Sequence, residues 1–97
     1  MDSKHWAHDR ADRAVRIKMI GGVGNPLFSV IWDRGHPNGP EIHIITDNGI
    51  IEIKNLYTNK LVTMLIASPR QLRRYNKPIP DNVMQIAAAH VRAGLNY

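Results

Sequence analysis

The middle of the sequence carries several side chains that can exchange protons or bind phosphate. His43, Lys54 and Thr63 fall on three successive apolar runs, and His36 stands in the loop RGHPNGP just before them. A histidine exchanges protons near neutral pH, an ammonium group neutralises an anion, and a hydroxyl hydrogen-bonds one. On one sheet face, His43 would be the general base, Lys54 would bind phosphate and Thr63 would assist. The alternative is that all four are ordinary surface residues.

Three arginines and a tyrosine follow the apolar run that ends at Ala67. Ser68 and Pro69 suit the N-cap and first position of a helical turn, because the serine hydroxyl accepts a backbone N–H and proline has none to leave unpaired. On that turn or directly after it lie Arg70, Arg73, Arg74 and Tyr75. Guanidinium forks and free backbone N–H groups bind phosphate oxygens, and a tyrosine ring can stack on a base. The turn is therefore predicted to cradle phosphate, with a solvated charged turn as the alternative.

Composition agrees with a polyanionic partner. The 97 residues hold 13 Lys and Arg against 8 Asp and Glu, a formal charge of +5 that favours RNA, another polyanion or an acidic protein surface. The chain has no cysteine, which excludes disulfides, zinc–thiolate sites and cysteine nucleophiles. No apolar run approaches the roughly 18 residues of a membrane span, and the charged start does not resemble a signal peptide. A cytoplasmic protein without membrane contact is expected.

The stretch EIHIITDNGIIEIKN is the clearest structural signal. Two alternating apolar runs flank Asn48-Gly49, a pair typical of a two-residue type I′ turn. That loop would pair His43 with Lys54 and Ile44 with Ile53. The expected inward side chains are Ile42, Ile44, Ile51 and Ile53, and the expected outward ones are His43, Lys54 and Glu52.

A second hairpin is expected to turn near residues 57–60 and to return through LVTMLIA. A two- or four-residue loop would put Thr63 on the face of His43 and Lys54, whereas a three-residue loop would bury it, because side chains alternate with period two. The two placements stay open. A free edge strand would also let a second copy pair with the sheet, so a homodimer stays open as well.

Helices are expected at both ends of the chain. A first helix would run from Asp2 or Ser3 to Ile20, a glycine-rich connector would follow, and a last helix would be capped by Asp81 and ended by Gly94. With a strand over residues 27–33, these elements predict one α+β domain over residues 1–97. It has an N-terminal helix, an antiparallel β-meander of three to four strands and a C-terminal helix.

Three motifs carry a resemblance to a known group of proteins. They are N-x-x-T-x-K-L-V-T-x-L-I (residues 55–66), GHPNGPEIH (35–43) and P-x-Q-L-x-R-Y (69–75). Together they resemble small phage and toxin-type ribonucleases of the barnase, colicin and RelE-like superfamily, over roughly residues 27–75. The resemblance implies metal-independent RNA cleavage, in which the ribose 2′-hydroxyl attacks the adjacent phosphate with help from His, Lys or Arg and Thr or Ser.

The N-terminal helix departs from that group's pattern. Many such nucleases carry there a histidine followed four residues later by arginine, whereas here His5 precedes Asp9 and His8 precedes Asp12. The histidine would have to come from His36 or His43. A zinc site on that pair would need further ligands, so no metal and no cofactor is expected. The alternative function is a non-enzymatic, phage-encoded module that binds nucleic acid or protein and acts as an inhibitor of a host component. An inhibitor or a host protein is also a possible partner.

Overall fold

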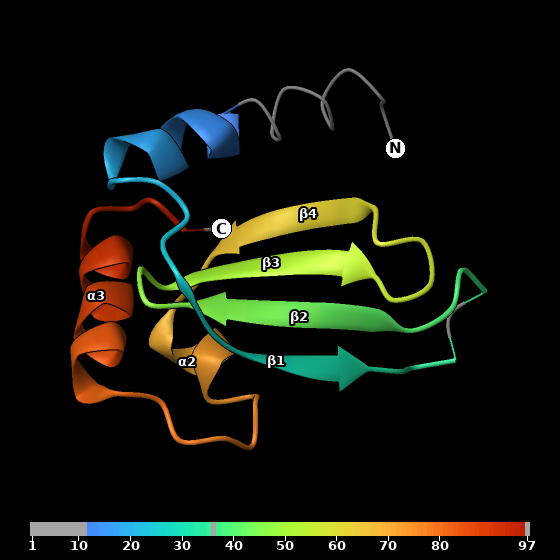
Figure 1. Cartoon of the computed structure of the whole chain (residues 1–97). Coiled ribbons are helices and arrows are strands. Elements are labelled where there is room, and N and C mark those ends of the chain that lie inside the picture. The colour runs from blue at the N-terminus through green and yellow to red at the C-terminus, as the bar shows by residue number, and fades with distance from the viewer. Residues whose placement is uncertain (1–11, 36, 97) are drawn as a thin grey trace.

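The computed structural model describes residues 12–35 and 37–96. Its centre is a four-stranded antiparallel sheet in the order β1-β2-β3-β4, a simple meander. The strands are β1 (Pro26–Trp32), β2 (Glu41–Thr46), β3 (Ile50–Asn55) and β4 (Leu61–Ile66), and the helices that follow are α2 (Pro69–Leu72) and α3 (Asp81–Arg92). Residues 12–19 form a helix before the sheet. The predicted α+β order is confirmed (Figure 1).

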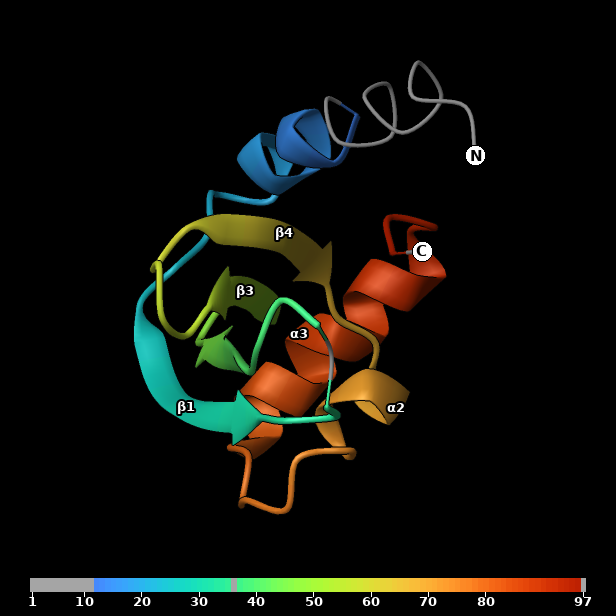
Figure 2. The ribbon, with the colours of Figure 1, turned by 90° about the vertical axis from the view of Figure 1, so that its right-hand side faces the viewer.

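The two faces of the sheet differ in what covers them. Helices α2 and α3 lie against one face, and the N-terminal helix (residues 12–19) lies beyond the edge strand β4 (Figure 2). Figure 1 looks onto the opposite face. The N-terminal helix packs on its β4 side, where Ile17 meets Ile50, Ile66 and Met64, and no helix of the described residues covers the rest of this face. The connector at residues 20–25 crosses only the end of that face nearest the β2–β3 turn.

The main core fills the space between the sheet and α2 and α3. Fully buried side chains from β2, β3 and both helices meet there, among them Ile45, Ile51, Leu72, Val83 and Ala87. Apolar burial on this scale is what holds a small domain together, at about 25 cal/mol per Å² of apolar surface removed from water.

A smaller core fixes the N-terminal helix on the other face of the sheet, next to the β2–β3 turn. Ile17 packs with Ile50 and Ile66, and the half-buried Val23 and Leu95 close the cluster. The helix ends where the N–H groups of two glycines bond to carbonyls of its last turn. Gly21 N–H binds Lys18 O at 3.2 Å, and Gly22 N–H binds Ile17 O at 2.9 Å. Both glycines have positive φ, as a left-handed helix end requires.

The predicted register between β2 and β3 is wrong by one residue. His43 pairs with Ile53 instead of Lys54, and Lys54 pairs with Ile42. Because side chains alternate along a strand, this shift exchanges the two faces of one strand relative to the other. His43 therefore shares the helix-covered face with Ile53, and Lys54 lies on the opposite face with Ile42.

The turn explains the shift. Gly49 has a φ of 72° and Asn48 is not among the positive-φ residues, so the turn is not the expected type I′. Strand β2 ends at Thr46 and β3 begins at Ile50, so the loop has three residues, and within it Gly49 N–H bonds to Thr46 O at 3.2 Å. The amide of Asn48 donates to Ile20 O at 3.0 Å and to Gly22 O at 2.8 Å, and Asp47 accepts from Asn25 N–H at 2.8 Å. These bonds to the connector support the longer loop.

Strand β4 is irregular at its first residues. Thr63 pairs with Ile53 and Leu61 with Lys54, so Val62 is an extra residue in a bulge. Thr63 thus lies in the same cross-strand row as Ile53 and His43, two strands away from the histidine. Of the two placements left open by the sequence, the structure shows Thr63 on the face of His43, but Lys54 is not on that face.

Of the two predicted N-caps, the one of α2 is confirmed and the one of α3 is wrong. Ser68 caps α2 as expected: its hydroxyl accepts from Gln71 N–H, and the Gln71 side chain accepts from Ser68 N–H at 2.8 Å. Asp81 does not cap α3. The N-cap is Pro80, and Asp81 is the first helical residue, where a carboxylate still favours the positive helix end. The predicted stop at Gly94 is confirmed by its φ of 68°.

Candidate functional site

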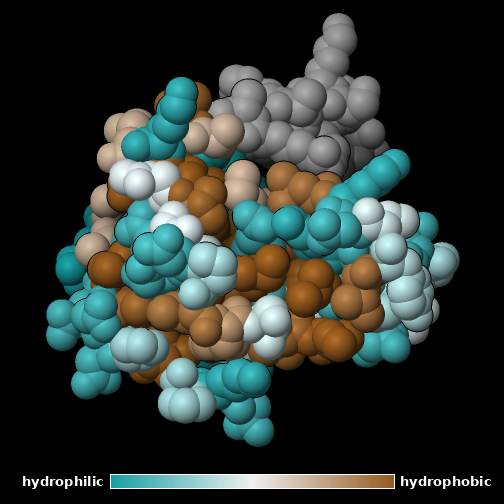
Figure 3. Space-filling model, viewed as in Figure 1, coloured by the Kyte–Doolittle hydropathy of each residue, from teal (hydrophilic) through white to brown (hydrophobic). Residues whose placement is uncertain are grey.

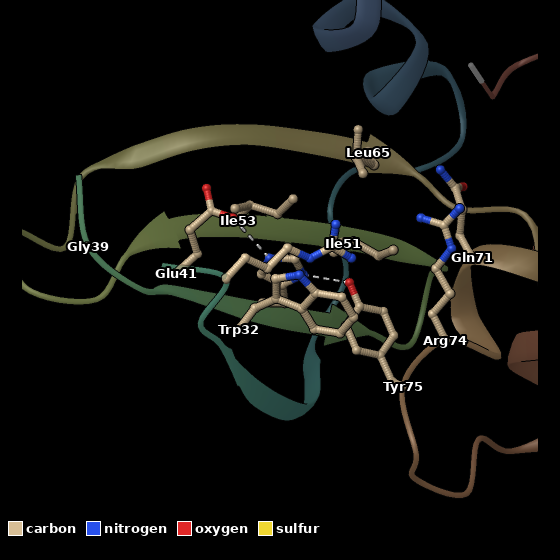
Figure 4. A pocket seen from close by; sticks show the side chains of 11 residues that line it. Trp32, Gly39, Glu41, Ile51, Ile53, Leu65, Gln71, Arg74 and Tyr75 are labelled. Atoms are coloured by element: carbon tan, nitrogen blue, oxygen red, sulfur yellow. Dashed lines mark hydrogen bonds and ion pairs between the residues drawn. The ribbon is translucent and has the colours of Figure 1, made fainter. Parts of the chain in front are cut away.

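A chain of hydrogen bonds centred on His43 lies on the helix-covered face. The Nδ1 atom of His43 is 2.6 Å from the Tyr75 hydroxyl, and its Nε2 atom is 3.4 Å from Glu41 Oε1, a longer contact (Figure 4). Glu41 and His43 are two residues apart on β2, so the pleat points both side chains to the same face. Tyr75 reaches them from the segment just after α2.

An aromatic cluster surrounds the imidazole. Trp32 on β1 stacks on His43 with ring centroids 5.2 Å apart and planes inclined by 17°, and Tyr75 meets both rings edge-on. The Arg34 guanidinium lies over the Trp32 ring, 4.8 Å from its centroid. Such cation–π contacts favour a fixed position for the cation. The cluster leaves His43 only 7% exposed.

Burial determines the protonation states of His43 and Tyr75. Loss of hydration lowers the pKa of His43, an effect that Glu41 opposes and the Arg34 charge reinforces. Burial also raises the pKa of Tyr75 to about 12, so its hydroxyl keeps the proton at neutral pH. Tyr75 O–H then donates to Nδ1, which leaves the proton of the neutral imidazole on Nε2, facing the Glu41 carboxylate.

The hydrogen-bonded side chains of Tyr75, His43 and Glu41 form one wall of a pocket of about 270 Å³. Arg34 and Glu41 line its mouth from the ends of β1 and β2, and Gln71 and Arg74 line it from α2 and the following turn. The floor is apolar and consists of Ile51, Ile53 and Leu65. The pocket therefore combines two guanidinium groups, one carboxylate and aromatic side chains with an apolar floor (Figure 4).

The Ser68 cap is what brings the polar side of α2 to the pocket. Ser68 and Gln71 bond reciprocally at the first turn, so the short helix begins at a defined residue after β4. Leu72 is fully buried and anchors the turn in the main core. With Leu72 and Tyr75 both facing inward, Arg74 projects along the rim.

Only some of the predicted site residues come together. His43, Arg74 and Tyr75 line the pocket, but Lys54 does not: it lies on the opposite face, where its ammonium group is 3.2 Å from Glu52. Thr63 is two strands from His43, and its hydroxyl accepts a hydrogen bond from Arg13 of the N-terminal helix at 2.8 Å. The predicted sharing of one face by His43 and Lys54 is thus wrong.

The predicted arginine cradle is also divided. Arg74 lines the His43 pocket, Arg73 lines a separate hollow with Lys77 and Ile79, and Arg70 is exposed on α2. Positions three and four apart would share one face of a continuous helix, but α2 ends at Leu72, so Arg73 is its C-cap and Arg74 lies beyond it and points elsewhere. His36 lies outside the described residues.

Three pocket residues were not predicted to act. Glu41 stands two positions before His43 on one strand, and this spacing alone would place both side chains on one face. Trp32 ends a run of strand-forming residues, and nothing in the local sequence distinguishes a core tryptophan there from one that stacks on a ligand. Arg34 stands in the loop after β1, and only the fold shows its ring contact with Trp32.

Two further findings concern partners and relatives. Within residues 12–35 and 37–96, no three His, Cys, Asp or Glu side chains are grouped so as to hold a metal ion, and no helix is long and apolar enough to span a membrane. Comparison of the chain with protein-family models, curated proteins and solved structures gives no match.

Proposed function

We propose that this protein is a metal-independent endoribonuclease and that the pocket around His43 is its active site. The observation that supports this proposal best is the Tyr75–His43–Glu41 hydrogen-bond chain, which ends at a partly exposed carboxylate in a pocket that Arg34 and Arg74 also line. The side chain of Glu41 is 35% exposed, whereas that of His43 is 9% exposed. Glu41 is therefore the group that a substrate can reach directly, and His43 holds it in place.

The proposed reaction needs a base and a cationic clamp. Glu41 accepts the proton of a ribose 2′-hydroxyl, whose oxygen then attacks the adjacent phosphorus while the bond to the 5′-oxygen breaks. Arg34 and Arg74 neutralise the charge that builds up on the phosphate oxygens. The departing 5′-oxygen takes its proton from the Glu41–His43 pair, so the proton count balances without water or metal.

Two matched pairs of variants test the proposal. Glu41→Gln and Arg74→Ala should each reduce RNA cleavage in EDTA by about 100-fold or more, the range expected for a lost general base or oxyanion partner. Arg73→Ala removes the same charge from the neighbouring residue, which lines another hollow, and should retain most of the activity. Equal losses in Arg73→Ala and Arg74→Ala, or full activity in Glu41→Gln, would contradict the proposed site.

One observation favours a second candidate, the non-enzymatic binding module. Both nitrogens of His43 already have partners, and the imidazole is almost fully buried. A pocket of this kind can hold a phosphate of RNA, or an acidic side chain of a protein, without turning it over. Salt-sensitive RNA binding by the wild type without cleavage in any buffer would support this second function over the first.

A further inference from the structure

The sheet face opposite the pocket carries two ordered rows of side chains. Cross-strand pairing gives one row as Ile31, Ile42, Lys54 and Leu61, and the next row as Ser29, Ile44, Glu52 and Met64. Each row has an apolar or small residue on β1, β2 and β4 and one charge on β3. No helix of the described residues lies over the β1, β2 and β3 residues of these rows (Figure 1), whereas Met64 on β4 packs against Ile17 of the N-terminal helix.

This face is unusually apolar for a surface. Ile31 is 61% exposed and Leu61 is 52% exposed, and Ile42, Ile44 and Met64 are half-buried beside them. Figure 3 shows the same face, with hydrophobic side chains gathered over the strands between hydrophilic margins. Contiguous apolar patches of this kind mark interaction surfaces more often than plain solvent boundaries.

Two opposite charges on β3 lie in the middle of this face and make its charge pattern differ between the two strand directions. Glu52 and Lys54 stand two residues apart on β3 and form an ion pair of 3.2 Å, and both side chains are largely shielded. Along the strand the pattern is therefore negative, then positive, with isoleucines alongside on β2. A surface with this pattern is complementary to itself when a second one is turned end over end.

We propose that a second copy of this chain docks on this face, sheet against sheet, about a two-fold axis that lies between the two sheets, runs across the strands and passes over β3 at the level of Ile53. This axis reverses the strand direction, so Glu52 of each copy faces Lys54 of the other. The same operation sets Ile42 against Ile44 and Ile31 against Ser29. Apolar residues thus meet apolar or small ones and unlike charges meet, as an isologous interface requires.

Charge complementarity favours a second copy over another occupant. An unrelated apolar partner would bury Glu52 and Lys54 with no new counter-charges, which costs free energy. In the two-fold arrangement each charge keeps its own neighbour and gains one from the other copy, and the four charges fix the register. The pocket around His43 lies on the other side of the sheet and stays open in such a dimer.

Charge-reversal variants test the dimer independently of activity. Wild-type protein should show a concentration-dependent monomer–dimer equilibrium in sedimentation velocity. Glu52→Lys alone and Lys54→Glu alone each bring like charges together across the axis, and each should weaken dimer formation by at least about tenfold.

A mixing experiment makes the result specific. An equimolar mixture of the Glu52→Lys and Lys54→Glu variants should form heterodimers, detected by native mass spectrometry. One variant carries two positive charges at positions 52 and 54 and the other carries two negative ones, so unlike charges meet across the axis. Neither copy regains its internal ion pair, so recovery reports contacts between copies. Circular dichroism of each variant alone checks that it is folded.

The proposal is overturned by any of three outcomes. Wild-type protein that stays monomeric up to high micromolar concentration shows that the face binds something other than a second copy. A wild-type dimer that neither reversal weakens is formed through another surface, such as the edge of β1. Folded variants that do not recover on mixing show that Glu52 and Lys54 do not meet across the axis.

Discussion

At the scale of the residue, the surroundings of His43 decide its chemistry. A histidine on a strand surface would titrate near neutral pH, but Trp32 and Tyr75 remove this one from water, and its pKa falls. The neutral ring accepts a hydrogen bond from Tyr75 and donates one to Glu41. His43 thus connects a protonated phenol to an accessible carboxylate, which is why Glu41 is assigned the reactive role.

The bond from Tyr75 to His43 should contribute measurably to stability. Tyr75→Phe keeps the ring but leaves the buried Nδ1 atom of His43 without its donor, which should cost about 1–3 kcal/mol of the free energy of unfolding. Urea denaturation measures this difference. Tyr57→Phe is the matched control, since Tyr57 is 76% exposed, and it should change the free energy by less than about 0.5 kcal/mol. Equal effects would show that the hydroxyl bond is not important.

Two buried histidines should make the fold sensitive to mild acid. Burial lowers the pKa of both His43 and His90, with Glu41 and the Ala67 backbone opposing the shifts. The unfolded chain then binds more protons than the folded one, so stability is complete above the unfolded value of about 6.5 and is lost as the pH falls through the lower folded values.

The expected result is a decrease in the urea midpoint between pH 8 and pH 5.5. His90→Gln should make this decrease smaller, because one of the two groups with a lowered pKa is gone, although the variant starts from a lower stability at pH 8. A midpoint that is flat or rises over this range would contradict the sign of both shifts.

At the scale of the element, the connector at residues 20–25 does more than join a helix to a strand. Its carbonyl groups at Ile20 and Gly22 accept from Asn48, and Val23 O accepts from Thr46 Oγ1 at 2.6 Å. These bonds cross more than 20 residues of sequence and hold the β2–β3 turn. The connector therefore helps to set which residues of β2 and β3 face the pocket.

Gly24 should be the most demanding glycine of this connector. Its φ is +87°, and a Cβ there would stand 2.5 Å from Asp47 Oδ1 and 2.8 Å from Asn48 Cβ. Gly24→Ala should cost about 2 kcal/mol or more, because both the conformation and the close approach oppose a side chain. Gly21 has a φ of +98°, but no atom lies within 4 Å of the place of an added Cβ. Gly21→Ala should therefore lower the free energy of unfolding by only about 1 kcal/mol. Thermal denaturation compares the two, and equal losses would show that contact with the turn does not matter.

At the scale of the whole molecule, charge and shape divide the protein into two working faces. The helix-covered face holds the pocket with Arg34 and Arg74, and the opposite face holds the paired Glu52 and Lys54. A formal charge of +5 over the molecule as a whole favours polyanions, and in the proposed function the pocket decides where a phosphate of RNA is held.

RNA affinity should accordingly depend on salt in a site-specific way. Arg74→Ala should flatten the plot of log affinity against log salt concentration by roughly one unit, since one phosphate contact is lost. Lys54→Ala removes the same charge from the opposite face and should leave the slope nearly unchanged. Fluorescence anisotropy with single-stranded RNA measures both. The same slope change in both variants would indicate binding by net charge alone.

The sequence by itself determined the order of the elements and several of their ends. Alternating apolar runs predicted the meander, Ser68-Pro69 predicted the start of α2, and Gly94 predicted the end of α3. These features depend on residues next to one another, so local rules suffice to find them. For the same reason the arginines after Pro69 could be located, although their directions could not.

Only the tertiary structure decided which side chains share a face. The faces depend on register, and a change of one residue in the loop moves Lys54 to the side away from His43. That loop is stabilised by Asn48 and Asp47 through bonds to residues 20–25, and nothing in the hairpin sequence announces those partners. The burial of His43 likewise depends on Tyr75, 32 positions further along the chain, which only folding brings near.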